Sequence, residues 1–173
     1  MGNDVVPAIG QGTFGIGGYH KADYSQDEHF IECLRYGFNL GMTLVDTAEN
    51  YAEGHAEELV GLAMEEYDRE KLFICTKVAP ENLRYNDVMQ SCTASLKRMR
   101  TDYIDGYFIH WPNPDIPIEE TMQALNKLQN SGCVCHIGVS NFSVREIEEA
   151  RQYGKIDAVQ AEYNIFDRTV EQD

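Results

Sequence analysis

The chain has 173 residues, of which 43% are hydrophobic and 25% are charged; these values are typical of a globular protein and exclude wholesale disorder. Its formal net charge is −15 and no basic cluster offsets it, which argues against nucleic acid or an anionic membrane surface as a partner. No apolar run approaches the length of about eighteen residues that a membrane span needs. The start of the chain has no basic region followed by an apolar one, so we expect no signal peptide and a cytoplasmic location.

Five cysteines without a Cys-x-x-Cys pair indicate reduced thiols rather than a disulfide framework. Cys33, Cys75 and Cys92 lie within apolar patterns that are typical of a core. Cys133 and Cys135 are two residues apart in an expected strand and would point the same way, but no further ligands cluster nearby. We therefore expect core thiols and no metal site.

A glycine-rich stretch follows the apolar start of the chain. Gly10, Gly12 and Gly15 formally match the Gly-x-Gly-x-x-Gly fingerprint of Rossmann folds. That fingerprint needs a helix that opens directly after the glycines, whereas Gly17 and Gly18 follow here and break helices. We reject the Rossmann interpretation and expect an N-terminal glycine-rich hairpin or loop.

Helical segments follow at regular intervals. Capping boxes are predicted at Ser25 with Glu28 and at Ser143 with Glu146, since serine precedes glutamate by three residues. Another helix begins near Gly54. The apolar faces that we expect to pack on a sheet are Phe30, Ile31, Leu34 and Phe38; Ala56, Leu59, Val60 and Ala63; Val88, Cys92, Leu96 and Met99; and Ile118, Met122, Leu125 and Leu128, ahead of Gly132 as a C′ residue.

Between these helices, short apolar runs end abruptly in polar residues, mostly at intervals of about thirty residues. This pattern is typical of βα units, whose parallel strands present their carboxyl ends at one edge of the sheet. The polar ends are Asp46, Lys77, His110, Ser140 with Asn141, and Gln160. A closed parallel barrel needs eight strands and about 250 residues. The sequence therefore predicts an α/β fold of the (β/α)8 TIM-barrel type, with one domain over residues 1–173, truncated after about five strands.

Four of the side chains at this edge suggest acid–base chemistry. An ammonium group beside a phenol stabilises the phenolate, so a tyrosine there can exchange a proton with a reacting oxygen. A neighbouring carboxylate keeps a buried ammonium charged, and a histidine can orient a carbonyl oxygen by a hydrogen bond. Each residue alone also fits an ordinary structural role, such as a turn cap or a solvated strand end. The four residues are Asp46, Tyr51, Lys77 and His110.

The ordered motifs closely resemble those of the aldo-keto reductases, which are nicotinamide-dependent (β/α)8-barrel enzymes. The resemblance runs from about residue 5 to the end of the chain. The matching motifs are Gly12-Thr13-Phe14-Gly15, Asp46-Thr47-Ala48-Glu49-Asn50-Tyr51, Thr76-Lys77-Val78, Ile109-His110-Trp111-Pro112, Gly138-Val139-Ser140-Asn141-Phe142, and Gln160 with Glu162-Tyr163-Asn164.

The resemblance implies reduction of an aldehyde or ketone by hydride transfer from NADPH, with NADH as the alternative. It implies a catalytic tetrad of Asp46, Tyr51, Lys77 and His110, with Tyr51 as the general acid. It also implies that the cofactor is contacted by Gly12, Thr13, Asp46, Ser140, Asn141 and Gln160, of which the last three hold the nicotinamide carboxamide. The implied lining of the substrate cleft is Phe14, Tyr51, His110 and Trp111, together with Thr13.

In this family the cofactor phosphates bind loops after the last strands, so the C-terminal third of the barrel is expected to lie outside this chain. We therefore expect the 173 residues alone to be inactive, or to self-associate through the open barrel edge. The sequence also departs from the family outside the tetrad, for example at Cys133 and Cys135, which occupy positions that are more often basic. Ala52 replaces a usual glycine, which predicts a stiffer turn, and Gly106 replaces a usual leucine inside a strand, which predicts poorer packing.

Two alternatives remain at this point. One is a non-catalytic regulatory or binding protein that keeps a reductase-like fold, which an intact tetrad argues against. The other is a different barrel enzyme, such as a phosphate-sugar isomerase, which the order of the motifs argues against.

Overall fold

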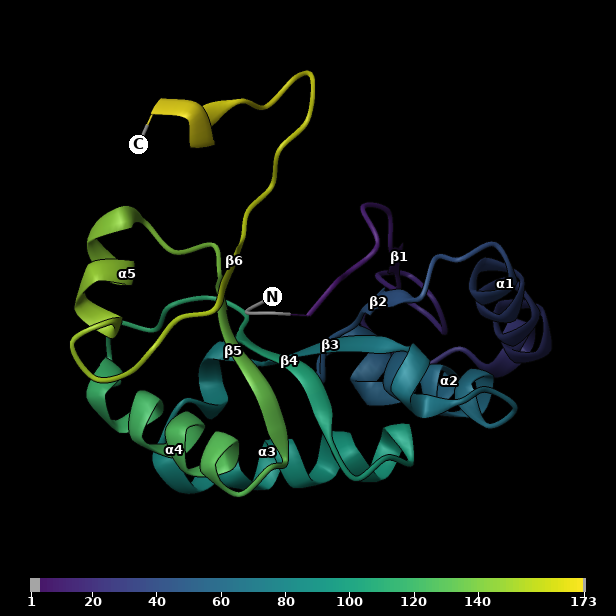
Figure 1. The fold of residues 1–173 in the computed structure, drawn as a ribbon, viewed down its shortest axis with the longest axis horizontal. Coiled ribbons are helices and arrows are strands. Elements are labelled where there is room, and N and C mark those ends of the chain that lie inside the picture. Colours follow the sequence, from purple (N-terminus) through teal and green to yellow (C-terminus); the bar gives the residue numbers. More distant parts are fainter. Residues whose placement is uncertain (1–3, 173) are drawn as a thin grey trace.

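A computed structural model, which describes residues 4–172, shows a parallel sheet of six strands in the order β1-β2-β3-β4-β5-β6 (Figure 1). Each strand pairs with the next strand along the chain, as successive βα units do. The strands are β1 (Gln11–Gly12), β2 (Leu44–Asp46), β3 (Phe73–Val78), β4 (Ile104–Ile109), β5 (Val134–Ser140) and β6 (Ala158–Gln160). The helices are α1 (Asp27–Asn39), α2 (His55–Met64), α3 (Tyr85–Met99), α4 (Ile118–Asn130) and α5 (Val144–Ala150). This arrangement confirms the predicted fold class, because it is part of a (β/α) barrel.

The helices cover the outer face of the curled sheet, and each helix packs beside the next one along the chain (Figure 1). The main core lies between the two layers and includes Ile74 and Val78 of β3. A smaller cluster of Phe73, Cys75 and Phe108 is buried on the inner face. Because side chains alternate along a strand, Lys77 falls on the inner face with Cys75.

The N-terminal segment differs from the prediction in one respect. Gln11–Gly12 forms β1, which is parallel to β2, so the sheet has six strands rather than the five counted in the sequence. The glycine-rich turn that follows closes with one antiparallel bridge between Gly15 and Gly18. Helical structure resumes only at Tyr24, which confirms that the Rossmann interpretation was rightly rejected. The sequence did not predict β1, because a strand of two residues is too short to show the alternation of apolar and polar side chains that identifies a strand.

Two of the predicted helix ends are confirmed and one is wrong. Ser143 and Glu146 form the capping box of α5, and Gly132 follows α4 with a φ of 82°. Ahead of α1, however, the side chain of Asp23 accepts the capping hydrogen bond from the Ser25 N–H and begins a short 3-10 turn. Aspartate and serine are comparable capping residues, so the sequence pattern did not distinguish them.

Gly106 in β4 does not cause the poor packing that the sequence predicted. A Cβ at this position would lie 2.9 Å from Cys75 Sγ and 2.9 Å from Phe108 Cε2, so those side chains already occupy the space. Gly138 in β5 lies against the same phenylalanine ring. The two glycines therefore let one large ring fill the inner face.

The sheet curls so that its early and late strands meet across the inner face. Gln160 of β6 donates Nε2–H to Asp46 Oδ1 of β2 over 3.0 Å, although 114 residues separate them in sequence. Near the amino ends of the strands, His136 stacks on Phe73 and makes a hydrogen bond of 2.6 Å with Asp4. These contacts fix the curvature that brings the polar strand ends together.

A buried carboxylate joins α2 to both β3 and α3. Glu57 is fully buried and accepts hydrogen bonds from Thr76 Oγ1 at 2.5 Å and from Arg98 Nε at 2.6 Å. Burial raises the pKa of Glu57, and the nearby Arg98 opposes that rise. Because α2 follows Tyr51 and β3 carries Lys77, this connection fixes the relative positions of two predicted site residues.

The cysteines are unpaired, and the two in the core are protonated. Burial raises the pKa of both Cys75 and Cys92 to about 12. Cys33 and Cys135 are exposed, so the prediction of core thiols is wrong for these two.

Beyond β6 the chain extends away from the sheet, as the yellow segment of Figure 1 shows, and ends in a 3-10 turn at Thr169–Gln172. Ile165 and Phe166 in this segment are almost fully exposed. Within residues 4–172, none of the helices combines the length and the apolar character that crossing a bilayer requires.

Candidate active site

A buried lysine is the centre of the predicted site. Lys77, in β3, is only 2% exposed, and its Nζ lies 2.8 Å from Asp46 Oδ2 at the end of β2. Nζ also donates to the Thr47 carbonyl oxygen over 2.8 Å and to the Tyr51 hydroxyl over 3.4 Å. Removing an ammonium group from water costs several kcal/mol, so it needs such partners to stay charged. The fold therefore assembles the carboxylate, the ammonium and the phenol in one hydrogen-bonded group.

The turn after Tyr51 directs its side chain toward this lysine. Ala52, Glu53 and Gly54 have positive φ angles of 50°, 57° and 94° in succession, after which α2 begins at His55. An alanine in the left-handed region costs about 1–2 kcal/mol relative to ordinary helix geometry. The chain thus maintains a strained turn directly beside Tyr51.

His110 follows β4 and completes the predicted tetrad. Its ring lies edge-on to Tyr51, with centroids 5.6 Å apart and planes inclined by 74°. Burial lowers the pKa of His110 to about 4, and the positive charge of Lys77 acts in the same direction. Its Nδ1 is buried without a hydrogen-bond partner in the part of the chain that the structure describes. The imidazole is therefore neutral at physiological pH.

The residues predicted to hold a nicotinamide carboxamide lie beside the tetrad. Asn141 follows β5 with a φ of 62°, a conformation that asparagine tolerates better than most residues. Its Nδ2 donates to the His110 carbonyl oxygen and to Ser140 Oγ, each at 3.0 Å. Gln160 of β6 donates to Asp46 of β2 across the inner face. Short hydroxyl and amide groups therefore border the tetrad at the ends of β5 and β6.

The N-terminal residues of the predicted site meet the same strand end. Gly12 of β1 pairs with Asp46 of β2, and Thr13 donates to the Asp46 carbonyl oxygen through both its N–H (3.0 Å) and its Oγ1 (3.1 Å). The ring of Phe14 lies 5.2 Å from that of Tyr51. Trp111 is about half exposed, and among residues 4–172 its indole makes no ring contact with the tetrad.

Some contacts of the site could not be read from the sequence. The Thr47 carbonyl oxygen accepts a hydrogen bond from Lys77. Every residue has a main-chain carbonyl group, so the sequence does not show which of them act as acceptors. The hydrogen bond between Gln160 and Asp46 depends on the curl of the sheet, which the strand pattern does not specify.

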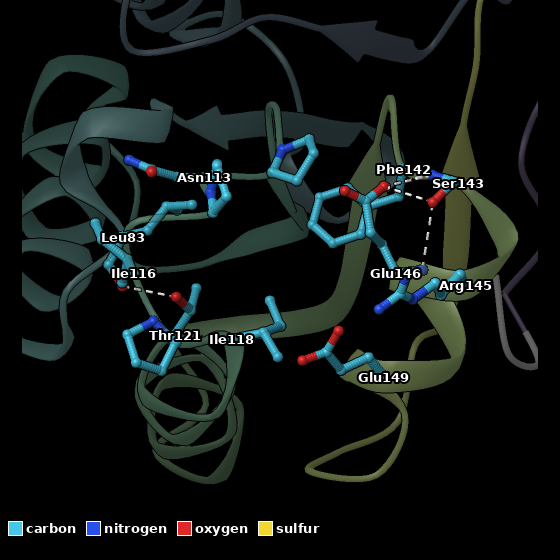
Figure 2. Close-up of a pocket in the computed structure, with 13 residues that line it drawn as sticks. Leu83, Asn113, Ile116, Ile118, Thr121, Phe142, Ser143, Arg145, Glu146 and Glu149 are labelled. Atoms are coloured by element: carbon cyan, nitrogen blue, oxygen red, sulfur yellow. Dashed lines mark hydrogen bonds between the residues drawn. The ribbon is translucent and has the colours of Figure 1, made fainter.

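Two pockets lie near the carboxyl edge of the sheet. One, of about 290 Å³, opens on the inner face and includes Asp46 and Gln160 in its lining. The other, of about 410 Å³, lies outside the tetrad, between the start of α4 and the start of α5. Figure 2 shows its Leu83, Ile116 and Thr121 facing Phe142, Arg145 and Glu146. Because no tetrad residue lines this second pocket, we assign the chemistry to the inner face.

Comparison with known proteins agrees with this geometry. Residues 8–173 match the family model described as "Aldo/keto reductase family". Methylglyoxal reductase YeaE of Escherichia coli (strain K12) is 42% identical over 151 residues, which are 87% of this chain and 51% of that protein. The chain therefore belongs to the aldo/keto reductase family.

Solved structures of the family have the same fold. The thermostable aldo-keto reductase Tm1743, in complex with the inhibitor epalrestat, superposes with a TM-score of 0.97 at 47% identity, over 99% of this chain and 63% of that one. An aldo-keto reductase from Klebsiella pneumoniae in complex with NADPH gives a TM-score of 0.88 at 35% identity, over 97% and 58% of the respective chains. The chain spans about half the length of the curated relatives it matches.

Proposed function

We propose that this chain carries the catalytic half of a carbonyl reductase, which reduces aldehydes or ketones with a nicotinamide cofactor and uses Tyr51 as the general acid. One observation carries the proposal: the Tyr51 hydroxyl lies 3.4 Å from Lys77 Nζ, which is itself 2.8 Å from Asp46. An ammonium at that distance stabilises negative charge on the phenol oxygen after it gives up its proton. Family membership supports the same chemistry.

His110 takes the role of a neutral hydrogen-bond donor in this proposal. A buried N–H without an acceptor is costly, so the proton is better placed on Nε2 than on the unpartnered Nδ1. The Nε2–H would then orient the carbonyl oxygen of the substrate while Tyr51 delivers its proton. A neutral imidazole also adds no further positive charge beside Lys77.

The residues around the tetrad fit a nicotinamide ring. The side chains of Ser140, Asn141 and Gln160 lie at adjoining strand ends, and two of them bond to tetrad residues. Such short polar groups can hold a planar carboxamide and orient the ring toward Tyr51. When bound, the cofactor supplies the hydride. NADPH is the proposed cofactor because a similar structure holds it, with NADH as the alternative. Five free thiols further support a proposed cytoplasmic location.

The test is NADPH consumption by the purified chain with methylglyoxal and with 4-nitrobenzaldehyde, with NADH in a parallel series. Tyr51→Phe keeps the ring and removes the proton, so it should abolish turnover. Tyr36→Phe, on the exposed side of α1, should leave it unchanged. Turnover that survives in Tyr51→Phe would contradict the proposed acid.

A second measurement covers the case in which these residues do not complete the cofactor site alone. The chain has one tryptophan, Trp111, next to His110, so energy transfer from Trp111 reports NADPH binding without turnover. Binding that Gln160→Ala weakens would support the nicotinamide site. Binding without turnover in the parent chain is the result that the expected incomplete barrel predicts, and absence of binding as well as turnover would count against the proposed nicotinamide site.

A further inference from the structure

Tyr19 lies in the glycine-rich turn between β1 and α1 and belongs to none of the motifs that match the family. Its ring contacts that of Phe14 edge-on, with centroids 5.6 Å apart and planes inclined by 74°. Phe14 contacts Tyr51 in the same way, at 5.2 Å and 64°. Tyr19, Phe14 and Tyr51 therefore form a continuous aromatic series that ends at the proposed general acid.

The backbone of the turn holds Tyr19 in this place from two sides. Gly15 has a φ of 91°, and a Cβ there would lie 3.1 Å from Cε1 of Tyr19, so glycine allows the ring to lie against the main chain. On the other side, the Tyr19 carbonyl oxygen accepts a hydrogen bond of 3.2 Å from the Ala52 N–H, next to Tyr51. The position of the ring is thus coupled to the turn that carries the reactive hydroxyl.

Although their position is fixed, these rings are largely uncovered. Tyr19 is 65% exposed and Phe14 is 63% exposed. Aromatic side chains lose little conformational entropy on binding, and they stack well on planar groups. Because the Phe14 ring separates Tyr19 from Tyr51, only a substrate that extends about one ring width beyond its carbonyl group can touch Tyr19.

We propose that Tyr19 is a specificity-determining residue, which together with Phe14 forms an aromatic wall that favours aromatic carbonyl substrates over small aliphatic ones. The proposal rests on the carbonyl-reductase function proposed above. A specificity role of Tyr19 differs in one measurable way from a role in supporting the turn. Loss of a wall affects only substrates that reach it, whereas loss of support for the turn affects all substrates alike.

The kinetic test compares kcat/KM for 4-nitrobenzaldehyde with kcat/KM for methylglyoxal. In Tyr19→Ala we expect the ratio of the two to fall about tenfold, as loss of one aromatic contact predicts. Tyr19→Phe keeps the ring and should keep the ratio. Tyr36→Ala removes a similarly exposed tyrosine on α1 (67%) and serves as the matched control. An equal loss for both substrates, or no loss, overturns the proposal.

A binding test separates this proposal from that of the reductase function. Quenching of Trp111 fluorescence by 4-nitrobenzaldehyde gives the dissociation constant without turnover. Tyr19→Ala should raise that constant about tenfold, while Tyr19→Phe and Tyr36→Ala leave it unchanged. If the parent chain binds the aldehyde without reducing it, the function proposal gains no kinetic support from this chain, and this comparison alone decides the role of Tyr19. Absence of binding, or equal binding by Tyr19→Ala, overturns the proposed wall.

Discussion

Burial and the charge of Lys77 lower the pKa of His110 to about 4, from an ordinary value of 6.5. We therefore expect the His110 ring to titrate near pH 4 when followed by NMR, with His110→Gln identifying its signal. Lys77→Met removes the second cause and should move the midpoint upward. A midpoint near 6.5 in the parent chain would contradict the neutral donor proposed for the site.

The same histidine makes stability depend on pH. Below about pH 6.5 the unfolded chain binds a proton at this residue and the folded chain does not, until the pH approaches 4. The free energy of unfolding should therefore fall as the pH drops through that interval. Urea unfolding of His110→Gln across the interval should show a shallower fall. An identical slope in both proteins would mean that His110 contributes nothing to it.

The ion pair between Lys77 and Asp46 is the second feature of single residues that can be tested. Asp46→Asn leaves a buried ammonium without its counter-charge and should cost about 3–5 kcal/mol in urea unfolding. The double variant Asp46→Asn with Lys77→Met should recover much of that loss, because no unpaired charge remains. Glu66→Gln breaks a surface pair with Arg35 and should cost under about 1 kcal/mol. If the changes in unfolding free energy of the two single variants simply add up in the double variant, the pair is not coupled.

Among the secondary-structure elements, a buried histidine connects α1 with α2. His55 at the start of α2 bonds to Asp27 of α1 and to Glu58, each at 2.9 Å, and the ring of Tyr24 packs on it. Burial acts to lower the pKa of His55, but the hydrogen bonds and charges of Glu58 and Asp27 outweigh it, so the pKa is raised above 6.5. When it is protonated, the ring holds two carboxylates of different helices together.

The raised pKa of His55 has the opposite effect on stability to that of His110. Between pH 6.5 and the raised value, the folded chain binds the proton and the unfolded chain does not. Its stabilising contribution is complete below pH 6.5 and is lost as the pH rises through the folded pKa. Urea unfolding should show this decline, and His55→Gln should remove it. The exposed His29→Gln on α1 is the matched control and should keep the decline.

At the scale of the whole molecule, the described sheet has two open edges, β1 and β6. Unpaired N–H and C=O groups on an edge strand can pair with another copy of the chain. We therefore expect concentration-dependent self-association in sedimentation velocity, and Val159→Lys on β6 should weaken it. Val144→Lys, on α5 and similarly exposed, should not. A sharp monomer boundary at every concentration of the parent chain would contradict this prediction.

The sequence predicted those parts of the molecule that depend on local pattern. Strands that end in Asp46, Lys77 and His110 were predictable because apolar runs and turn residues follow the period of each element. The two-residue strand β1 was too short to show a period. The cap at Asp23 competed with an equally good serine nearby.

The candidate site was predictable only in part, for a related reason. Parallel strands imply that the tetrad residues share an edge, but not that the Thr47 carbonyl oxygen completes the shell around Lys77. The aromatic contact of Tyr19 with Phe14 depends on three-dimensional turn geometry, which residue types alone do not specify. Contacts through main-chain atoms and across the sheet therefore required the structure.

The hydrogen bond between Gln160 and Asp46 has a consequence for biosynthesis. Gln160 lies 114 residues after Asp46, so the ribosome must make that whole stretch before the partner of Asp46 exists. A contact of such long sequence separation forms late, because the intervening chain must first be ordered. The nascent chain thus carries Asp46 without this partner until Gln160 has been made. During that interval, unpaired strands are exposed to chaperones and to neighbouring nascent chains on the same messenger.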